Sequence, residues 1–361
     1  MKKSVFILLA LLLGMTATAQ TQKQKLTITT KRGKVHTYVM GESMDSLRIL
    51  NDVGIKVYPK GTKVSKDYLF SQITYTLTNE PTPTPDPSGK NANRNTTADL
   101  KKNPQGWRLE FPRFYQGTNK TYEITHFTTE NGKRMNNYSV EWDAKLKANR
   151  WTCYEMYDKM MQKNVKRKNK FKPDPDIPLN MQTTQEDYSG SGFDRGHLCP
   201  SDDRCCSQAM NDQTFYLSNM QPQVHGHNGG VWKNLEEKVR AWAGKCDTLY
   251  VVKAATIDKA EYICNKKDLN EIAEKEGKPA GSLHFPGIVP KYFYMALLAY
   301  DKKTNTYRAL GIWSPHYKKS KYDYITIEEL QKRTGIDFFC NLDDSIEKAV
   351  EATVDSDYWE K

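Results

Sequence analysis

The sequence predicts an α+β protein, in which a small all-β module precedes a larger domain with a central, mostly antiparallel sheet. Short stretches that alternate apolar and polar residues occupy residues 20–79, and a proline-rich stretch then interrupts the pattern. Beyond it, aromatic-rich strand candidates and amphipathic helix candidates follow one another without the regular alternation of a parallel sheet. A chain of 361 residues is also longer than one typical domain, so two domains are expected.

Residues 1–19 have the pattern of a secretory signal peptide. Lys2 and Lys3 form a basic start, residues 5–13 are apolar, and Ala17 and Ala19 offer a small-residue cleavage site. The apolar run is far shorter than the roughly 20 residues that span a bilayer. We therefore expect an exported protein, periplasmic or secreted, whose mature chain has no membrane span.

Residues 20–79 are expected to form the small β module. Residues 25–29 and 73–78 alternate with period two, and residues 35–39 are a further strand candidate. Residues 80–106 are predicted to be a linker, because prolines recur from Pro81 to Pro87. The polar residues that follow these prolines carry too little apolar surface to fold by burial.

Residues 107–345 are expected to form the main domain, and residues 346–361 a C-terminal tail. A helix is predicted over residues 326–334, with Gly335 as its stop signal. Another is predicted after Asn228, which is a good N-cap. The apolar face of this second helix would consist of Val231, Trp232, Leu235, Val239 and Trp242. The predicted strands are residues 107–111, 151–157, 248–252 and 292–300.

The composition favours an anionic partner without requiring one. Lys and Arg number 54 against 43 Asp and Glu, a formal charge of +11, which suits nucleic acid but also ordinary solubility. Export permits disulfides, yet the odd count of seven cysteines leaves at least one unpaired in a monomer. No CxxC spacing occurs, so a structural zinc site has little support.

The histidine at the centre of residues 191–243 is the main catalytic candidate. His197 follows Arg195 and Gly196, and an imidazole with a pKa near ~6.5 can accept a proton from water at neutral pH. The Arg195 guanidinium matches the geometry of a phosphate. A structural alternative stays open, in which Asp194 and Arg195 form a buried ion pair and His197 packs beside it.

Two oxygen-bearing side chains follow in the predicted helix region. Asn228 offers an amide oxygen and Glu236 a carboxylate, the ligand types that hard divalent cations prefer. On an ideal helix the two lie about 12 Å apart along the axis, so Glu236 is expected to reach an ion through a water molecule. Asn228 could instead serve only as a helix cap.

Two neighbouring motifs are ambiguous. The basic loop over residues 163–176 is equally consistent with a solvated loop and with phosphate contact. His225 and His227 have the HxH spacing found in some zinc sites, but no third soft ligand has suitable spacing. We therefore interpret this pair as part of a loop.

Four separated motifs follow one another in residues 191–243. They are Asp194-Arg195-Gly196-His197, Thr214-Phe215-Tyr216-Leu217-Ser218-Asn219, Pro222-Gln223, and Asn228 with Trp232 and Leu235-Glu236. In this order they resemble the DNA/RNA non-specific endonucleases of the ββα-metal, or His-Me finger, group, which includes Serratia-type nucleases and mitochondrial endonuclease G. The nine-residue step from Asn219 to Asn228 and the eight-residue step to Glu236 match that pattern. The resemblance extends more weakly over residues 107–344, and it implies a ββα-metal nuclease domain.

The resemblance implies a role for each matching residue. His197 would be the general base on the attacking water, and Arg195 would help to neutralise the phosphate. Asn228 would be the single direct protein ligand of a Mg²⁺ ion, with Mn²⁺ able to substitute. Glu236 would orient metal-bound water, and Asn219 would brace the site.

The family also uses an arginine from the preceding basic loop. Arg167 is the nearest match, with Asn169 and Lys170 as competing positions. The chain departs from the family after the strand at residues 250–252, where it has Lys253-Ala254-Ala255-Thr256 in place of a glycine-containing turn. This departure concerns the shape of the substrate groove more than the chemistry.

These observations predict an exported, Mg²⁺-dependent endonuclease. It would cleave DNA and/or RNA with little sequence specificity and leave 5′-phosphate ends, as the resemblance implies. The alternative from another class is a non-catalytic envelope protein that binds nucleic acid or a surface partner. A phosphodiesterase of small molecules is less favoured, because the basic excess suits a polyanion.

Overall fold

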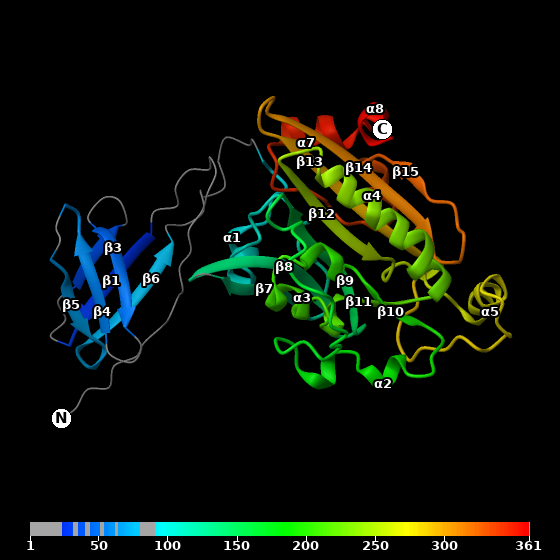
Figure 1. Cartoon of the computed structure of the whole chain (residues 1–361), viewed down its shortest axis with the longest axis horizontal. Helices are drawn as coiled ribbons and strands as arrows, with labels where there is room; N and C mark the ends of the chain where they lie inside the picture. The colour runs from blue at the N-terminus through cyan, green and yellow to red at the C-terminus, as the bar shows by residue number, and fades with distance from the viewer. Residues whose placement is uncertain are drawn as a thin grey trace. The chain divides into compact units, whose positions relative to one another are not determined.

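The computed structural model describes residues 24–31, 35–39, 44–50, 54–61, 64–79, 91–130 and 132–360. They form two compact units (Figure 1). The first contains the described parts of residues 1–84 together with 129–135, and the second those of 85–128 and 136–361. The predicted signal peptide, residues 1–19, lies outside the described residues.

The first unit is the small all-β module that the sequence predicts. Its two three-stranded antiparallel sheets enclose an apolar core that includes Leu26, Ile55 and Val57. One sheet has the order β2 (Val35–Val39), β1 (Gln24–Thr30) and β6 (Ile73–Asn79), and the other β3 (Met44–Leu50), β4 (Gly54–Pro59) and β5 (Lys66–Leu69). Alternating residues supply this core, as the period of two predicts.

The second unit is built on a seven-stranded sheet of order β15-β14-β13-β12-β9-β8-β7. Every pairing from β15 to β8 is antiparallel, which confirms the predicted sheet type. The strands are β7 (Thr121–Glu130), β8 (Lys133–Asp143), β9 (Ala148–Met156), β12 (Thr248–Ala255), β13 (Tyr292–Asp301), β14 (Thr306–Pro315) and β15 (Asp323–Ile325).

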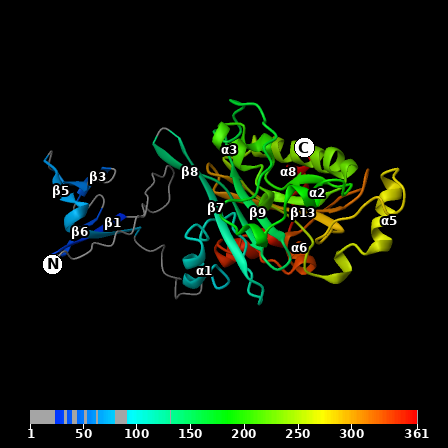
Figure 2. The ribbon, with the colours of Figure 1, turned by 90° about the horizontal axis from the view of Figure 1, so that it is seen from below.

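Both faces of this sheet are covered. In β12, Val251 faces the core formed with α4 (Lys233–Ala243), whereas Val252 faces the core formed with α6 (Ile327–Thr334). Figure 2 shows α3 (Gln208–Gln213) on one side of the sheet and α1 (Thr97–Lys102) and α6 on the other. Because neither face meets water, β12 and β13 read as nearly continuous apolar runs.

The remaining helices are short. They are α2 (Gln185–Tyr188), α5 (Lys266–Lys275), α7 (Asp344–Glu351) and α8 (Ser356–Trp359). Among the described residues, no helix has the length and apolar character needed to cross a membrane. The predicted helix over residues 326–334 is confirmed as α6, with Thr326 as N-cap and Gly335 in the left-handed conformation (φ 75°) at its end.

The stretch predicted as a linker is folded from residue 91 onward. Within it, α1 begins with a capping box between Thr96 and Asp99, and Arg113 pairs with Asp99 at 2.7 Å. The buried Asn95 amide donates to the carbonyls of Gly106 and Pro112. The linker was predicted to be unfolded because it has little apolar surface to bury. Hydrogen bonds and an ion pair hold it in place instead.

The predicted strand over residues 107–111 is wrong. Phe111 N–H donates to the Arg108 carbonyl, which closes a turn. The prediction rested on the aromatic residues of this stretch, but its charged residues Arg108 and Glu110 pair with each other at 2.6 Å. Arg108 also reaches Glu155 on β9, so the charged residues point inward, not to solvent.

The last residues are likewise part of the fold and do not form a free tail. Trp359 is only 1% exposed and packs edge-on against Trp242 of α4, with 5.1 Å between ring centroids. The Trp242 indole N–H also donates to the Trp359 carbonyl at 2.9 Å. A single buried indole therefore ties the C-terminal segment to the main core.

We expect His316 to make stability depend on pH. Its Nδ1–H donates to the Pro290 carbonyl, and its Nε2 accepts the Val224 N–H, both at 2.8 Å. Burial lowers the pKa of His316 to about 4, against the opposing bond to Pro290. Its stabilising contribution is therefore complete above about pH 6.5 and declines as the pH falls towards 4.

Between pH 7 and pH 5 this residue should cost the fold about 2 kcal/mol of unfolding free energy. Urea unfolding of the parent and of His316→Gln at both pH values measures the difference, which should shrink in the variant. Exposed His284→Gln is the control and should behave like the parent. Equal pH sensitivity in parent and His316→Gln would contradict this assignment.

Candidate active site

The predicted site residues other than Arg167, which lies in the preceding loop, belong to one ββα unit. Strands β10 (Asp194–His197) and β11 (Met220–Gln223) pair antiparallel, with His197 opposite Met220 and Gly196 opposite Gln221. A π-helical turn, His227–Trp232, then leads into α4. The chain thus forms the hairpin and helix that the resemblance implies.

Asn228 lies inside this π turn and does not cap a helix, so the predicted N-cap is wrong. Its backbone N–H donates to the Val224 carbonyl at 2.9 Å, and α4 begins only at Lys233. The predicted apolar face is otherwise correct, because Trp232, Leu235, Val239 and Trp242 are all buried. Wide turns of this type are frequent at functional sites.

His197 is half-buried between two aromatic rings. Its ring centroid lies 5.7 Å from that of Phe171 and 5.0 Å from that of Phe215. Its Nε2 is shielded from solvent and has no hydrogen-bond partner among the described residues. Leaving such an atom without a partner costs about 1–3 kcal/mol, a cost that a bound ligand would remove.

The charge state of His197 follows from its surroundings. Burial, and then the positive charges of Arg167 and Lys253, lower the pKa of His197 to about 3. The imidazole is therefore neutral at physiological pH. A neutral imidazole can accept a proton, which an imidazolium cannot.

Two guanidinium groups flank the same aromatic pair. The Arg195 Cζ lies 4.4 Å from the Phe171 centroid, and the Arg167 Cζ lies 5.3 Å from the Phe215 centroid. The sequence left three loop positions open, and Arg167 is the one whose positive charge lowers the pKa of His197. Lys170 instead pairs with Asp212, and the Asn169 side chain accepts a hydrogen bond from Arg167.

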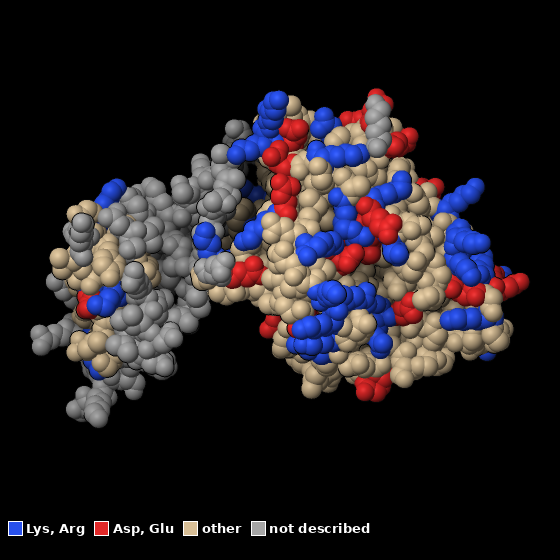
Figure 3. Space-filling model, in the orientation of Figure 1, with Lys and Arg blue, Asp and Glu red and all other residues tan. Residues whose placement is uncertain are grey.

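Basic side chains gather on this side of the second unit. In Figure 3 a patch of Lys and Arg lies between the places where Figure 1 labels α3 and β10. Residues 166–170 of the preceding loop are all exposed, and Lys166, Arg167, Lys168 and Lys170 are four of the five. An exposed cluster of cations favours contact with a polyanion.

Asn219 is fully buried, and its amide contacts backbone groups. Its Oδ1 accepts the Cys199 N–H at 2.8 Å, while its Nδ2 donates to the carbonyls of Cys199 and Thr214, both at 2.9 Å. These bonds join the residues after β10 to those before β11. Asn219 thus holds the hairpin without facing the open side of the site.

Asn228 presents an amide oxygen. Its Nδ2 donates to Asp194 Oδ2 at 2.9 Å, and His225 Nδ1 contacts the same oxygen at 2.9 Å. In the described part of the chain the Asn228 side chain bonds through Nδ2 to Asp194, and Oδ1 has no partner. The amide is fixed through its nitrogen, and its oxygen is left open, which suits a hard divalent cation. The residues present therefore fit the predicted metal.

Glu236 lies in the first turn of α4 and is paired with a buried lysine. Its Oε1 is 3.5 Å from Lys253 Nζ, and Lys253 is fully buried on β12. Burial raises the pKa of Glu236 to about 7, although Lys253 opposes that shift. In the sequence Lys253 was noted only as a departure from the family. Its position within an apolar strand was the one sign that it needs a buried partner.

Sequence reasoning missed Asp194 as a partner of Asn228. The motif containing it was recognised, but a contact across 34 positions has no local signal. The prediction that the HxH pair lies in a loop is wrong, because the chain is already helical at His225 and the π turn begins at His227. His225 is exposed and contacts Asp194, whereas His227 is buried between Gln223 (2.6 Å) and Ser314 (2.9 Å).

In the part of the chain that the structure describes, two other groups of side chains are close enough to hold a metal ion. They are His126 with Asp174 and Asp176, and Asp337 with Glu347 and Glu351. Both already have partners, since His126 Nε2 is 3.0 Å from Asp174 and the Asn93 amide donates to Asp337 and Glu347. Neither group contains a residue of the ββα unit.

Comparison with known proteins points to one family. Residues 118–345 match the family model of the DNA/RNA non-specific endonucleases. A nuclease of Nostoc sp. is 26% identical over 233 residues, covering 61% of this chain and 77% of the relative. Mitochondrial nuclease EXOG of Xenopus laevis is 28% identical over 214 residues, covering 57% and 58% respectively.

Two further proteins are similar to this chain. Nuclease C1 of Cunninghamella echinulata is 34% identical over 181 residues, covering 48% of this chain and 68% of the relative. A chain in the crystal structure of the EndoG/EndoGI complex is 22% identical, with a TM-score of 0.48, and covers 62% of this chain and 89% of that one. Among the three sequence relatives, the chain spans between 58% and 77% of their length.

Gly196→Ala should destabilise the hairpin. A Cβ at this position would lie 2.1 Å from Gln223 Oε1 and 2.7 Å from Gln223 Cβ, and Gln223 is fully buried. Overpacking of this kind costs about 1–3 kcal/mol. Chemical denaturation measures the loss.

Gly244→Ala is the matched control, because its Cβ would meet its nearest neighbour at an ordinary 3.4 Å. It should leave the unfolding free energy nearly unchanged. A Gly196→Ala protein as stable as the parent would show that the backbone at β10 yields easily.

Proposed function

Because the chain belongs to the DNA/RNA non-specific endonuclease family, we propose that it is an exported, Mg²⁺-dependent endonuclease that cleaves DNA and/or RNA with little sequence specificity. The family is one of hydrolytic, metal-dependent nucleases. One observation supports the proposal most directly. The unpartnered Nε2 of neutral His197, two guanidinium groups and the open amide oxygen of Asn228 all belong to, or flank, a single hairpin–helix unit.

In the proposed mechanism His197 acts as the general base. Its neutral imidazole takes a proton from water as that water attacks phosphorus. Arg195 and Arg167 hold the phosphate and offset its charge, since a guanidinium fork matches phosphate oxygens. Asn219 positions the segments on either side of His197 through its three backbone bonds.

Asn228 would hold the metal ion directly, and Glu236 would act on it through water. The ion, when bound, stabilises the negative charge that develops on the phosphate and the leaving oxygen. Asp194 fixes the Asn228 side chain so that its oxygen stays open. Lys253 keeps the Glu236 carboxylate oriented at the start of α4.

Recognition of the substrate is proposed to be mainly electrostatic. The chain carries a formal charge of +11, and the exposed lysines and arginine of residues 166–170 adjoin the histidine site. Contacts to phosphate carry no sequence information, so little sequence preference follows. Export, to the periplasm or the medium, is supported by the signal-peptide pattern of residues 1–19. Products with 5′-phosphate ends follow from the family resemblance alone.

Incubation of the mature protein with plasmid DNA and with RNA, in Mg²⁺ or in a chelator, tests the proposal. We expect cleavage in Mg²⁺ and none in chelator. His197→Ala should lose at least about 10²–10⁴-fold in rate, the usual contribution of general-base catalysis. Asn228→Ala should lose rate and require more Mg²⁺.

His36→Ala, in the first unit, is the control and should cleave like the parent. Binding of nucleic acid without cleavage by the parent would support the non-catalytic alternative. Parent-like rates in His197→Ala would remove this histidine from the mechanism.

Arg167→Ala should weaken substrate binding in a salt-dependent way. Each lost phosphate contact lowers the slope of log affinity against log salt by about 1. Binding to an inactive His197→Ala background, measured by fluorescence anisotropy over a salt series, provides the slopes. Arg308→Ala, which removes a pair with Asp355, is the control. Identical slopes for the two variants would place Arg167 outside the phosphate contacts.

A further inference from the structure

The turn that carries Asn228 is fixed by a helix outside the ββα unit. Phe193, just before β10, and Val224, just after β11, pack in one apolar cluster with Ile272 and Ala273 of α5. The α5 helix therefore contacts both strands' flanking residues at one end of the catalytic hairpin, the end where Asp194 pairs with Gln223. A pair of four-residue strands is too small to be stable without such support.

Polar contacts tie the same two points. Glu276, directly after α5, accepts the Gly226 N–H through Oε2 at 2.8 Å and the Lys318 N–H through Oε1 at 3.0 Å. At the same end of the hairpin, on the segment before β10, Lys278 Nζ donates to the Gly192 carbonyl at 3.1 Å. One carboxylate thus joins the turn after β11 to the loop after β14.

The contact at Gly226 leaves no space for a side chain. A Cβ there would lie 2.6 Å from Lys318 Cβ and 2.7 Å from Glu276 Oε1. Backbone and carboxylate approach this closely only because residue 226 is glycine. The position of Glu276 and the glycine at residue 226 therefore depend on each other.

Movement of Gly226 would be passed directly to Asn228. The N–H groups of both His227 and Asn228 donate to the Val224 carbonyl, so residues 224–228 form one hydrogen-bonded turn. Gly226 lies in the middle of this turn. Its position sets the start of the π turn and hence the direction of the Asn228 amide.

We propose that Glu276 is a positioning residue for the metal-binding turn: it holds the Gly226 backbone so that the Asn228 amide oxygen faces the cation site. This inference rests on the proposed function and adds a residue outside the family motifs to it. Glu276 would act through the Gly226 backbone and not on the substrate or the ion. Partners that orient metal ligands in this way typically contribute 10–100-fold to metal affinity or activity.

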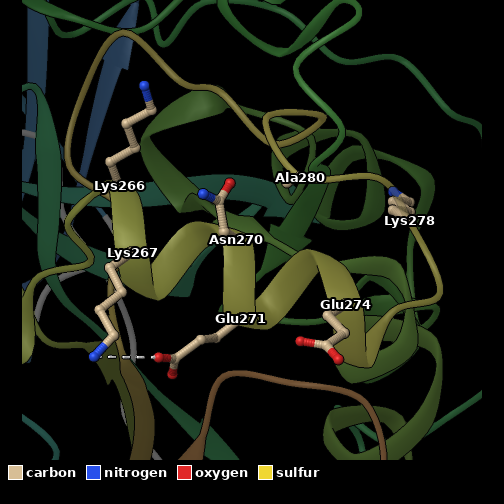
Figure 4. Close-up of a pocket in the computed structure, with 7 residues that line it drawn as sticks. All are labelled: Lys266, Lys267, Asn270, Glu271, Glu274, Lys278 and Ala280. Atoms are coloured by element: carbon tan, nitrogen blue, oxygen red, sulfur yellow. Dashed lines mark ion pairs between the residues drawn. The ribbon is translucent and has the colours of Figure 1, made fainter.

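The outer face of α5 supplies a matched control. Figure 4 shows Glu274 among the residues lining an open hollow of about 660 Å³ on that face, together with Asn270 and Lys278. Glu274 is exposed and lies in α5, two positions before Glu276. Glu274→Ala removes the same charge from the same region without touching the Gly226 turn.

The experiment compares Glu276→Ala, Glu276→Gln and Glu274→Ala. Bound Mn²⁺ is measured by electron paramagnetic resonance in an inactive His197→Ala background, and kcat and KM are measured on DNA in the active background. For Glu276→Ala we expect about 10- to 100-fold weaker Mn²⁺ binding and a similar fall in kcat, with KM within about twofold. Glu276→Gln should fall between parent and Ala, because its amide oxygen still accepts one of the two bonds. Glu274→Ala should match the parent.

Circular dichroism and thermal melting show whether each variant is folded. If Glu276→Ala does not fold, the comparison of Glu276→Gln with the parent tests the inference. Parent-like Mn²⁺ affinity and kcat in a folded Glu276 variant would overturn the inference, as would an equal loss in Glu274→Ala. Failure of the proposed function gives a different result, because the parent itself would then neither bind Mn²⁺ nor cleave DNA.

Discussion

The pairing of β10 with β11 is the constraint on which the site depends. Four residues on each strand bring His197 opposite Met220, and the π turn that follows brings Asn228 back against Asp194. So short a ladder has little stability of its own. Asn219 holds it from within through backbone bonds, while Trp232 anchors it to α4 and its indole N–H reaches the His197 carbonyl at 3.3 Å. The large sheet behind α4 supplies the rigid support.

Much of the fold could be predicted from the sequence, because the residues that indicate its helices and strands lie within those elements. Gly335 ends α6 in a left-handed conformation that other residues rarely adopt, and the apolar run of β13 is long enough to be unambiguous. Wrong predictions arose where distant polar contacts replace local pattern. Arg108 and Glu110 turn inward to Glu155, and Asn95 satisfies carbonyls 11 and 17 residues away. Neither effect leaves a periodic trace in the sequence.

The candidate site divides in the same way. His197, Arg195, Asn219, Asn228 and Glu236 could be named from motif and spacing, since their chemistry and order along the chain are visible. Their surroundings could not. The π turn that holds Asn228, its bond to Asp194, and the pairing of Glu236 with Lys253 all depend on how separate elements pack. A residue's chemical type is encoded locally, but its partner is set by the tertiary fold.

The charges around His197 have two opposite consequences. Burial, and then the positive charges of Arg167 and Lys253, lower the pKa of the imidazole, which keeps it neutral but makes it a weak base. The same guanidinium at Arg167 is exposed and suited to phosphate. A phosphate bound beside Arg167 would offset only the part of the shift that comes from this guanidinium, because burial is the larger cause. Arg167 therefore both helps to keep the imidazole unprotonated and offers a contact for the group on which that imidazole would act.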